Sequence, residues 1–276
     1  MVGHSLRVIA STTRVNLIMT WRFFSWTGFG LRFFTPVMTL GAAWVLYNVV
    51  YAGSKLPPQF GTAIGSSGYV SFITVGNAFY VFVFAAAFVV GRVMFWERAT
   101  GTIEATFMTP MSRLAYMSGI MVAAATNALV DFTAVFLLGI AFGFQVALFN
   151  APLFFTSLLL TAVGLFGIGL ITNAVTLTFR DRATTANSLM ILFMVFCGLV
   201  CPVELMPSWA QMISKVLPLT YGVSLMRSSL IGTGTVDVTY NILALLVLGA
   251  FYVAVGALTL RLIERNLRKK ALFSVF

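Results

Sequence analysis

Long apolar runs constrain this chain more than any other feature of its sequence. Runs long enough to cross the roughly 30 Å hydrocarbon core of a bilayer occur at 29–51, 68–91, 118–147, 153–178, 184–202 and 238–262. The chain is 60% hydrophobic and only 9% charged, which leaves too little polar surface for a soluble domain. The sequence therefore predicts an all-α membrane protein, in which residues 1–276 form a single transmembrane domain that crosses the bilayer six times.

Basic residues are concentrated in alternate connections between these runs. Three of the 17 Lys and Arg residues, Lys55, Lys215 and Arg227, fall on one predicted side. The other fourteen precede or open the first run, lie in the second and fourth connections, or end and follow the last run. This distribution predicts that both termini are cytoplasmic, because basic residues remain on the cytoplasmic side. The net charge of +10 is thus explained by membrane topology, and no nucleic-acid partner is expected.

Two further segments are amphipathic and too short or too polar to span. Residues 1–27 are expected to form an interfacial helix with Arg7, Ser11 and Arg14 on its polar face. Such a helix would anchor the chain to anionic membrane lipids, and it could also touch a partner protein. Residues 203–234 are expected to form two short re-entrant or interfacial helices on the outer side, the first capped by Ser208. The second of them carries an apolar face, made by Leu219, Val223, Met226 and Leu230.

A compact polar segment, residues 97–113, interrupts the apolar sequence after the second run. Gly101 is expected to end the preceding helix, and Thr102 can cap a new one that Pro110 ends. Glu104 in its first turn would complement the helix dipole. Ile103 and Phe107 belong to an apolar edge that a merely solvated connection does not need. This edge suits a helix that docks into a groove on another protein.

Residues for catalysis, nucleotide binding or metal binding are missing from the sequence. It contains no Gly-x-x-x-x-Gly-Lys-Ser/Thr phosphate-binding loop. No Ser, His and acid gather in the arrangement of a catalytic triad, and His4 has no neighbouring metal ligands. Cys197 and Cys201 are expected to be small buried hydrophobic residues. We therefore expect no catalytic residue, no metal site and no cofactor in this chain.

Asp131 is the one acidic residue inside a predicted span. A carboxylate at this depth costs about 2.5–3.5 kcal/mol on insertion scales, so it is expected to face the bundle interior. An interhelical hydrogen bond explains it more simply than a proton relay, because no span offers a second acid, His or Lys to receive the proton. A polar contact with the substrate is the other alternative. The aromatic second run, with Phe79 and Tyr80, is more often bulk that faces lipid and neighbouring helices than a ligand site, although it would suit an apolar substrate.

Residues 97–113 carry the resemblance to a known family. Glu97-Arg98, Gly101-Thr102-Ile103-Glu104, Thr109-Pro110 and Ser112-Arg113 resemble the motif after the second span of permease subunits of type-2 ATP-binding-cassette exporters. Residues 217–222 with Arg227 resemble a second, looser family motif, in which Asn is commoner than Leu217. The six-span layout extends the resemblance over nearly the whole chain.

The resemblance implies a permease subunit in the plasma (inner) membrane of a prokaryote. Two separate ATPase subunits would bind ATP and Mg and would dock at residues 97–113. The site residues implied for coupling are Glu97, Arg98, Gly101, Thr102, Ile103, Glu104, Phe107, Thr109, Pro110 and Arg113. The outer helices, with Tyr221 and Arg227, would line the exit for drugs, lipids, glycolipids or lipid-linked polysaccharides. A second permease copy is implied, with a homodimer favoured over a heterodimer.

Two other functional classes compete with this interpretation. A proton-coupled secondary transporter or a channel would use Asp131, but such proteins usually carry several intramembrane charges or broken helices in matching halves. An intramembrane enzyme would need the catalytic residues that the sequence does not contain.

Overall fold

The computed structural model describes residues 2–22, 34, 37–42, 44–45, 68–91, 93, 97, 100–102, 112–144, 146, 149–178, 182–232 and 237–269. Every secondary-structure element in these ranges is helical, which confirms the predicted all-α class. The elements are α1 (Val2–Arg22), α4 (Gly68–Phe84), the π-helical turn η3 (Ala85–Val90), α7 (Arg113–Ala141), α8 (Ala151–Thr178), α9 (Arg182–Phe196), the short η4 (Val203–Leu205), α10 (Ser208–Val216), α11 (Pro218–Ile231) and α12 (Val238–Lys269).

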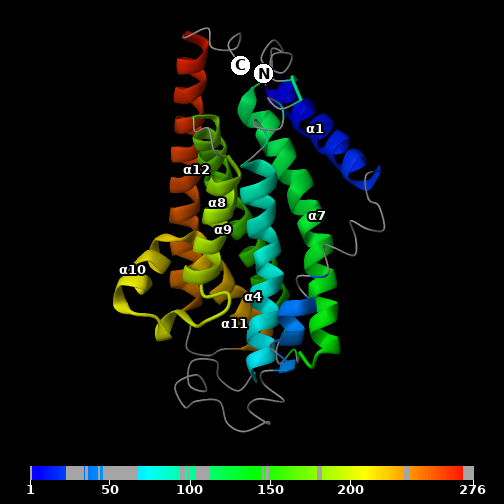
Figure 1. Ribbon diagram of the computed structural model, residues 1–276, viewed down its shortest axis with the longest axis vertical. Coiled ribbons are helices and arrows are strands. Elements are labelled where there is room, and N and C mark those ends of the chain that lie inside the picture. Colours follow the sequence, from blue (N-terminus) through cyan, green and yellow to red (C-terminus); the bar gives the residue numbers. More distant parts are fainter. Residues whose placement is uncertain are drawn as a thin grey trace.

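The long helices α7, α8 and α12 are each long and apolar enough to cross a membrane, and α4 is a shorter apolar helix. They run lengthwise beside one another in Figure 1. The predicted runs at 68–91, 118–147, 153–178 and 238–262 thus correspond to helices. Most of the run at 29–51 lies outside the described residues, so the total of six spans stays a prediction.

Two helix boundaries differ from the sequence-based expectation. The run at 184–202 is helical only to Phe196, because the chain turns at Gly198, whose φ of 73° is left-handed. In α10, Ser208 is the first helical residue and makes no side-chain cap; Pro207 holds the N-cap position, so the predicted Ser208 cap is wrong.

Glycines set the closest helix packing. A Cβ on Gly167 of α8 would lie 2.4 Å from the backbone nitrogen of Val253 in α12, and one on Gly256 would lie 2.6 Å from the carbonyl oxygen of Gly167. Between α4 and α7, a Cβ on Gly139 would lie 2.2 Å from the Thr74 side chain. These helices approach so closely only because no side chain separates them.

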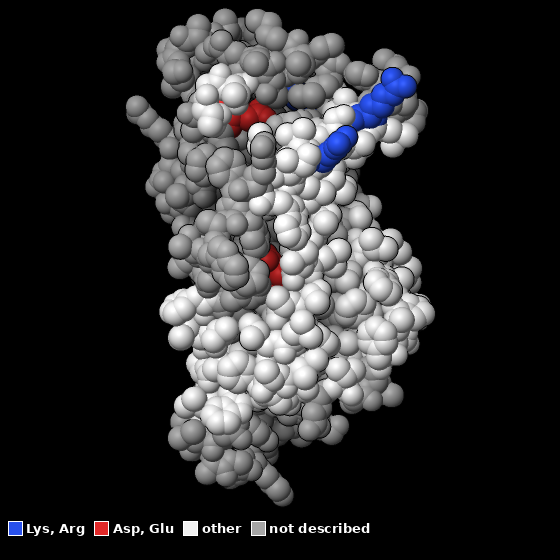
Figure 2. Space-filling model, turned by 90° about the vertical axis from the view of Figure 1, so that its right-hand side faces the viewer, with Lys and Arg blue, Asp and Glu red and all other residues white. Residues whose placement is uncertain are grey.

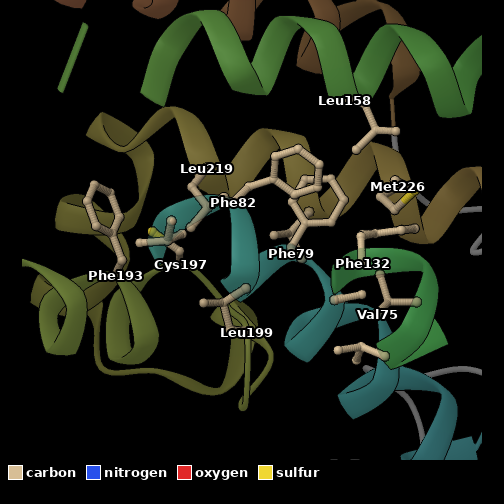
Figure 3. Packing of buried hydrophobic residues seen from close by; sticks show 14 of the residues in the cluster. Val75, Phe79, Phe82, Phe132, Leu158, Phe193, Cys197, Leu199, Leu219 and Met226 are labelled. Atoms are coloured by element: carbon tan, nitrogen blue, oxygen red, sulfur yellow. The ribbon is translucent and has the colours of Figure 1, made fainter. Parts of the chain in front are cut away.

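The main apolar core joins α4, α7, α8 and the outer helices. Phe79 and Phe82 of α4 meet Phe132 of α7 with ring centroids 6.3 and 6.0 Å apart in edge-on arrangements. Figure 3 shows these rings close to Leu219 and Met226 of α11 and to Cys197 and Leu199 after α9. The predicted apolar face of α11 is buried in this core, which confirms that face: Leu219, Val223, Met226 and Leu230 are each at most 1% exposed.

The short helix α10 presents its apolar side outward. Trp209, Met212 and Val216 are more than half exposed, whereas Ala210 and Ser214 are buried against the bundle. The Ser214 hydroxyl donates to the Phe196 carbonyl oxygen at the end of α9. This outward apolar face is what an interfacial helix needs, and the interfacial placement itself stays a prediction.

Candidate coupling site and membrane cavity

The chain leaves the second span through a glycine-terminated helical turn. Gly101 has φ 72°, and the Thr102 N–H donates to the Glu97 carbonyl oxygen at 2.9 Å, the six-to-one bond of a Schellman end. The hydroxyls of Thr100 and Thr102 also donate to this carbonyl, at 3.3 and 3.2 Å. The predicted helix end at Gly101 is therefore confirmed. Thr102 closes the end of this turn, and the helix that it is predicted to begin falls on residues 103–111, outside the described residues.

The next span begins at a capped helix terminus. Ser112 is the N-cap of α7, and its hydroxyl accepts the Ala115 N–H at 3.2 Å. Because of this cap, α7 starts at Arg113, five positions before the apolar run that the sequence shows. The connection of residues 103–111 is thus bounded by two defined positions, Thr102 before it and Ser112 after it.

A buried polar cluster ties these two positions together. The Tyr116 hydroxyl of α7 donates to Oε1 of Glu97, which belongs to the turn before Gly101. Glu97 and Arg113 are only 9% and 6% exposed, so the site contains one acid and one base away from water. Burying charges of both signs in one region reduces the cost of burying either. The cluster holds the start of α7 against the end of the second span.

The remaining predicted coupling residues, Arg98, Ile103, Glu104, Phe107, Thr109 and Pro110, lie outside the described residues. Their docking role stays a prediction. Glu97, Gly101 and Thr102 lie in the turn before this connection, and Arg113 begins the helix after it.

Asp131 lines a cavity of about 90 Å³ between α1, α4, η3 and α7, which we call the α1–α7 cavity. Three other polar residues line it: Asn16 and Thr20 from α1, and Asn127 from α7. The rest of its wall is apolar and includes Phe84 and Val89. The space is large enough to hold water, which needs only about 10–15 Å³ of this kind of volume. Figure 2 shows an acidic group at mid-height among uncharged atoms, well below the Lys and Arg atoms.

The helix α1 forms one wall of this cavity by packing along α7. The Thr13 hydroxyl donates to the Gly119 carbonyl oxygen at 3.0 Å. Further along both helices, the Asn127 side-chain amide donates to the Thr20 hydroxyl oxygen at 3.5 Å. A Cβ on Gly119 would lie 2.9 Å from the Ile9 carbonyl oxygen, so this glycine permits the close contact. Arg7 and Arg14 are exposed, as expected for the polar face. An interfacial position for the helix stays a prediction.

The other predicted substrate residues lie at separate places. Phe79 is fully buried in the core, and Tyr80 is partly buried beside it. Tyr221 lies on α11, where its hydroxyl donates to the Lys215 carbonyl oxygen at 2.9 Å. These residues do not form one site with Asp131, and their role in a substrate pathway stays a prediction.

Arg227 fastens α11 to the bundle. Its guanidinium lies 3.4 Å from the centroid of the Phe72 ring and donates to the carbonyl oxygens of Phe72 and Leu199, each at 3.3 Å. A cation over an aromatic face is attracted by the ring quadrupole, and the carbonyl dipoles add to this. The contact links α11, α4 and the turn at Gly198.

Sequence reasoning missed a polar link between α8 and the π-helical turn. Asn173 donates through Nδ2 to the Val90 carbonyl oxygen at 2.8 Å, and the Thr176 hydroxyl donates to the Gly91 carbonyl oxygen at 3.1 Å. A π turn leaves carbonyls without their usual helical partners, and these side chains satisfy two of them. The only sequence signal was a polar Asn173 and Thr176 one turn apart within an apolar span.

Within the described residues, no group of three or more His, Cys, Asp and Glu could hold a metal ion. Cys197 is buried in the main core and Cys201 is half-buried; both are free thiols.

Comparison with protein families gives one match, and comparison with individual curated proteins gives none. The matching family is described as ABC-2 type transporter, and its model covers residues 8–231. The matched range contains α1 from residue 8 onward, the connection from Glu97 to Arg113, the α1–α7 cavity and both outer helices. This chain, a multi-pass membrane protein, belongs to the ABC-2 type transporter family and is the membrane subunit of an ABC transporter.

Proposed function

We propose that this chain exports an amphipathic substrate from the cytoplasm, driven by ATP that two separate ATPase subunits bind and hydrolyse with Mg. The observation that carries the proposal is the construction of the connection at 97–113. A Schellman end at Gly101 and a cap at Ser112 define its two boundaries, and the Tyr116–Glu97 bond joins them. A segment held at both ends can transmit a push from a docked protein to two spans at once.

An amphipathic cargo, such as a drug, lipid, glycolipid or lipid-linked polysaccharide, agrees with the surface of the bundle. The described spans expose large apolar side chains, among them Leu137, Leu159 and Val247, each more than 60% exposed. Such surfaces face lipid or a second subunit. We propose a homodimer in the inner membrane of a prokaryote, with both termini cytoplasmic.

The coupling role is tested with two matched glycine substitutions. Gly101 and Gly143 both have positive φ, 72° and 98°, and a Cβ on either meets no atom within 4 Å. Alanine at each position carries a similar backbone cost of about 1–2 kcal/mol. Gly101 lies at the proposed docking segment, whereas Gly143 follows the far end of α7.

We expect Gly101→Ala to reduce both the substrate-stimulated ATP hydrolysis of the complex and the amount of ATPase that copurifies with the permease. Gly143→Ala should leave both quantities near the wild-type level. The measurement uses complexes reconstituted in proteoliposomes at equal permease content. Equal loss in the two variants would contradict a coupling role for the 97–113 connection.

A proton-coupled transporter remains the second candidate, favoured by the presence of Asp131 at a cavity large enough for water. The two functions differ in their energy source. Export that persists without ATP and stops when a protonophore collapses the proton gradient would favour this second candidate.

A further inference from the structure

The polar side chains that line the α1–α7 cavity offer hydrogen-bond acceptors. One side-chain amide N–H of Asn16 donates to the Thr12 backbone carbonyl oxygen at 2.9 Å. The Thr20 hydroxyl donates to the Asn16 backbone carbonyl oxygen at 2.8 Å. Asn127 in turn directs its amide N–H to the Thr20 hydroxyl. Each of these three side chains thus uses one donor within the protein. The side-chain oxygens of Asn16 and Asn127 stay available as acceptors beside the second N–H of each amide, and the Thr20 oxygen keeps one acceptor position.

Asp131 adds a carboxylate to the same cavity. It lies one helical turn from Asn127, so the two side chains project from the same face of α7. A carboxylate offers two oxygens with about four acceptor positions, so it can bind a ligand while keeping a contact within the protein. A site with a negative charge and several acceptor oxygens favours a cation that carries N–H donors.

The size and the walls of the cavity narrow the choice of cation further. One water takes about 10–15 Å³ on this measure, so a volume of about 90 Å³ accommodates an ammonium group with several attached carbons. Phe84 and Val89 on its wall are 43% and 40% exposed, so the cavity opens to the surface beside apolar side chains. A hydrocarbon tail can leave along these side chains. The ring of Phe84 also favours a nearby cation.

The wall formed by η3 is a second, independent sign of a built site. Ala85 and Val89 line the cavity from the π-helical turn, which is wider than an α-helical turn. Such turns are rare and are found frequently at functional sites. Here Asn173 and Thr176 stabilise its carbonyl groups from the opposite side.

We propose that the α1–α7 cavity binds the protonated primary amine of an amphipathic molecule, with Asp131 as its counter-ion and Asn16, Asn127 and Thr20 as acceptors. This inference adds a ligand class to the proposed export of amphipathic cargo. It rests on that proposed function only if the bound amine belongs to the cargo. An amine-bearing lipid headgroup has the same chemistry. In either case, the bound ammonium neutralises the one carboxylate that the described spans place at this depth.

The test uses a photoreactive derivative of dodecylamine and the matched derivative of dodecanol, on the purified permease in phosphatidylcholine nanodiscs. Mass spectrometry locates the crosslinks. We expect the amine to label peptides of α4 and α7 around the cavity at least about tenfold more than the alcohol does. Equal labelling by the uncharged alcohol would overturn the proposal. This comparison uses the wild-type protein and needs no variant.

Three variants then assign the charge. Asp131→Asn should reduce amine labelling by about tenfold, whereas Asp131→Glu should retain most of it. Asp237→Asn is the matched control, because Asp237 is an exposed acid that caps α12 through the Tyr240 N–H, and Asn caps equally well. Each variant is checked for monodispersity and thermal unfolding. Wild-type amine labelling in folded Asp131→Asn would overturn the proposal.

A final arm identifies the source of the amine. Phosphatidylethanolamine in the nanodiscs should compete with the probe if the site binds a lipid headgroup, since this lipid carries N–H donors that phosphatidylcholine lacks. Undiminished labelling would assign the site to a cargo amine. Because no ATPase is present, failure of this binding test leaves the test of ATP coupling at Gly101 intact.

Discussion

Buried polar side chains on either side of the 103–111 connection are held by specific partners. Glu97 and Arg113 lie 16 positions apart in sequence, yet both are buried where the second and third spans meet. Tyr116 supplies a hydrogen bond to the Glu97 carboxylate. A buried carboxylate that loses such a donor keeps its desolvation cost without the compensating bond, so this tyrosine should matter for stability.

Tyr116→Phe removes only the hydroxyl. We expect it to destabilise the permease by about 1–3 kcal/mol, because the buried Glu97 loses a donor. The measurement is thermal unfolding of the detergent-solubilised protein, followed by size-exclusion chromatography. The control is Tyr252→Phe, whose hydroxyl donates to the Val216 carbonyl oxygen at 3.3 Å in an exposed position, with an expected loss below about 1 kcal/mol. An equal shift in the two variants would refute the special role of Tyr116.

At the scale of elements, the π-helical turn is the least regular part of the described bundle. Six residues, Ala85–Val90, depart from the α-helical pattern between a buried helix and the connection to Glu97. Asn173 and Thr176 of α8 bind the carbonyls at its end, so α8 acts as a clamp on this turn. A π-helical turn inside a bundle needs partners for its displaced carbonyl groups, and α8 supplies them here.

Two isosteric substitutions on α8 separate the clamp from ordinary helix packing. Thr176→Val loses the bond to Gly91 in another element, whereas Thr172→Val loses only a bond to Ile168 within its own helix. Both threonines are buried. We expect Thr176→Val to cost about 1–3 kcal/mol and Thr172→Val less than about 1 kcal/mol.

Hydrogen exchange gives the second measurement for this pair. Amides of residues 85–91 should exchange faster in Thr176→Val than in the wild type, and at the wild-type rate in Thr172→Val. Unchanged exchange in Thr176→Val would show that the turn holds its shape without the clamp.

At the scale of the whole molecule, the described chain has two distinct ends. Figure 1 places the start of α1, the start of α7 and the end of α12 at one end, with α10 and α11 toward the other. On the face drawn in Figure 2, Lys and Arg atoms gather toward the first end. This arrangement agrees with an even number of crossings and with the positive-inside distribution, and the side of the membrane is a prediction.

Cysteines at positions 55, 150 and 268, introduced after Cys197 and Cys201 are replaced by alanine, test this orientation. An impermeant thiol reagent should label positions 55 and 150 on intact cells, because both lie in outer connections of the predicted topology. Position 268 should react only after permeabilisation, which serves as its control. Labelling at 268 without labelling at 55 on intact cells would reverse the topology.

The sequence predicted the helices better than it predicted the sites. Runs of apolar residues identified α4, α7, α8 and α12, because a helix satisfies the backbone hydrogen bonds of one continuous apolar run within that run. Helix ends needed local detail: the Ser112 cap extends α7 to Arg113, and Gly198 ends the fifth run early. Asn173 and Thr176 carried too weak a signal, since their partners are backbone carbonyls more than 80 positions away.

What the sequence by itself determined is the class of this protein, the order of its spans, the orientation that its basic residues imply and the family motif between Glu97 and Arg113. These features are local or additive along the chain, so composition and spacing reveal them. Only the tertiary structure decided that Tyr116 reaches Glu97, that Arg227 lies on Phe72, and that α1 joins Asp131 in forming a cavity. Such contacts depend on how closely the helices approach one another. That separation is set jointly by glycines that lie far apart in the sequence.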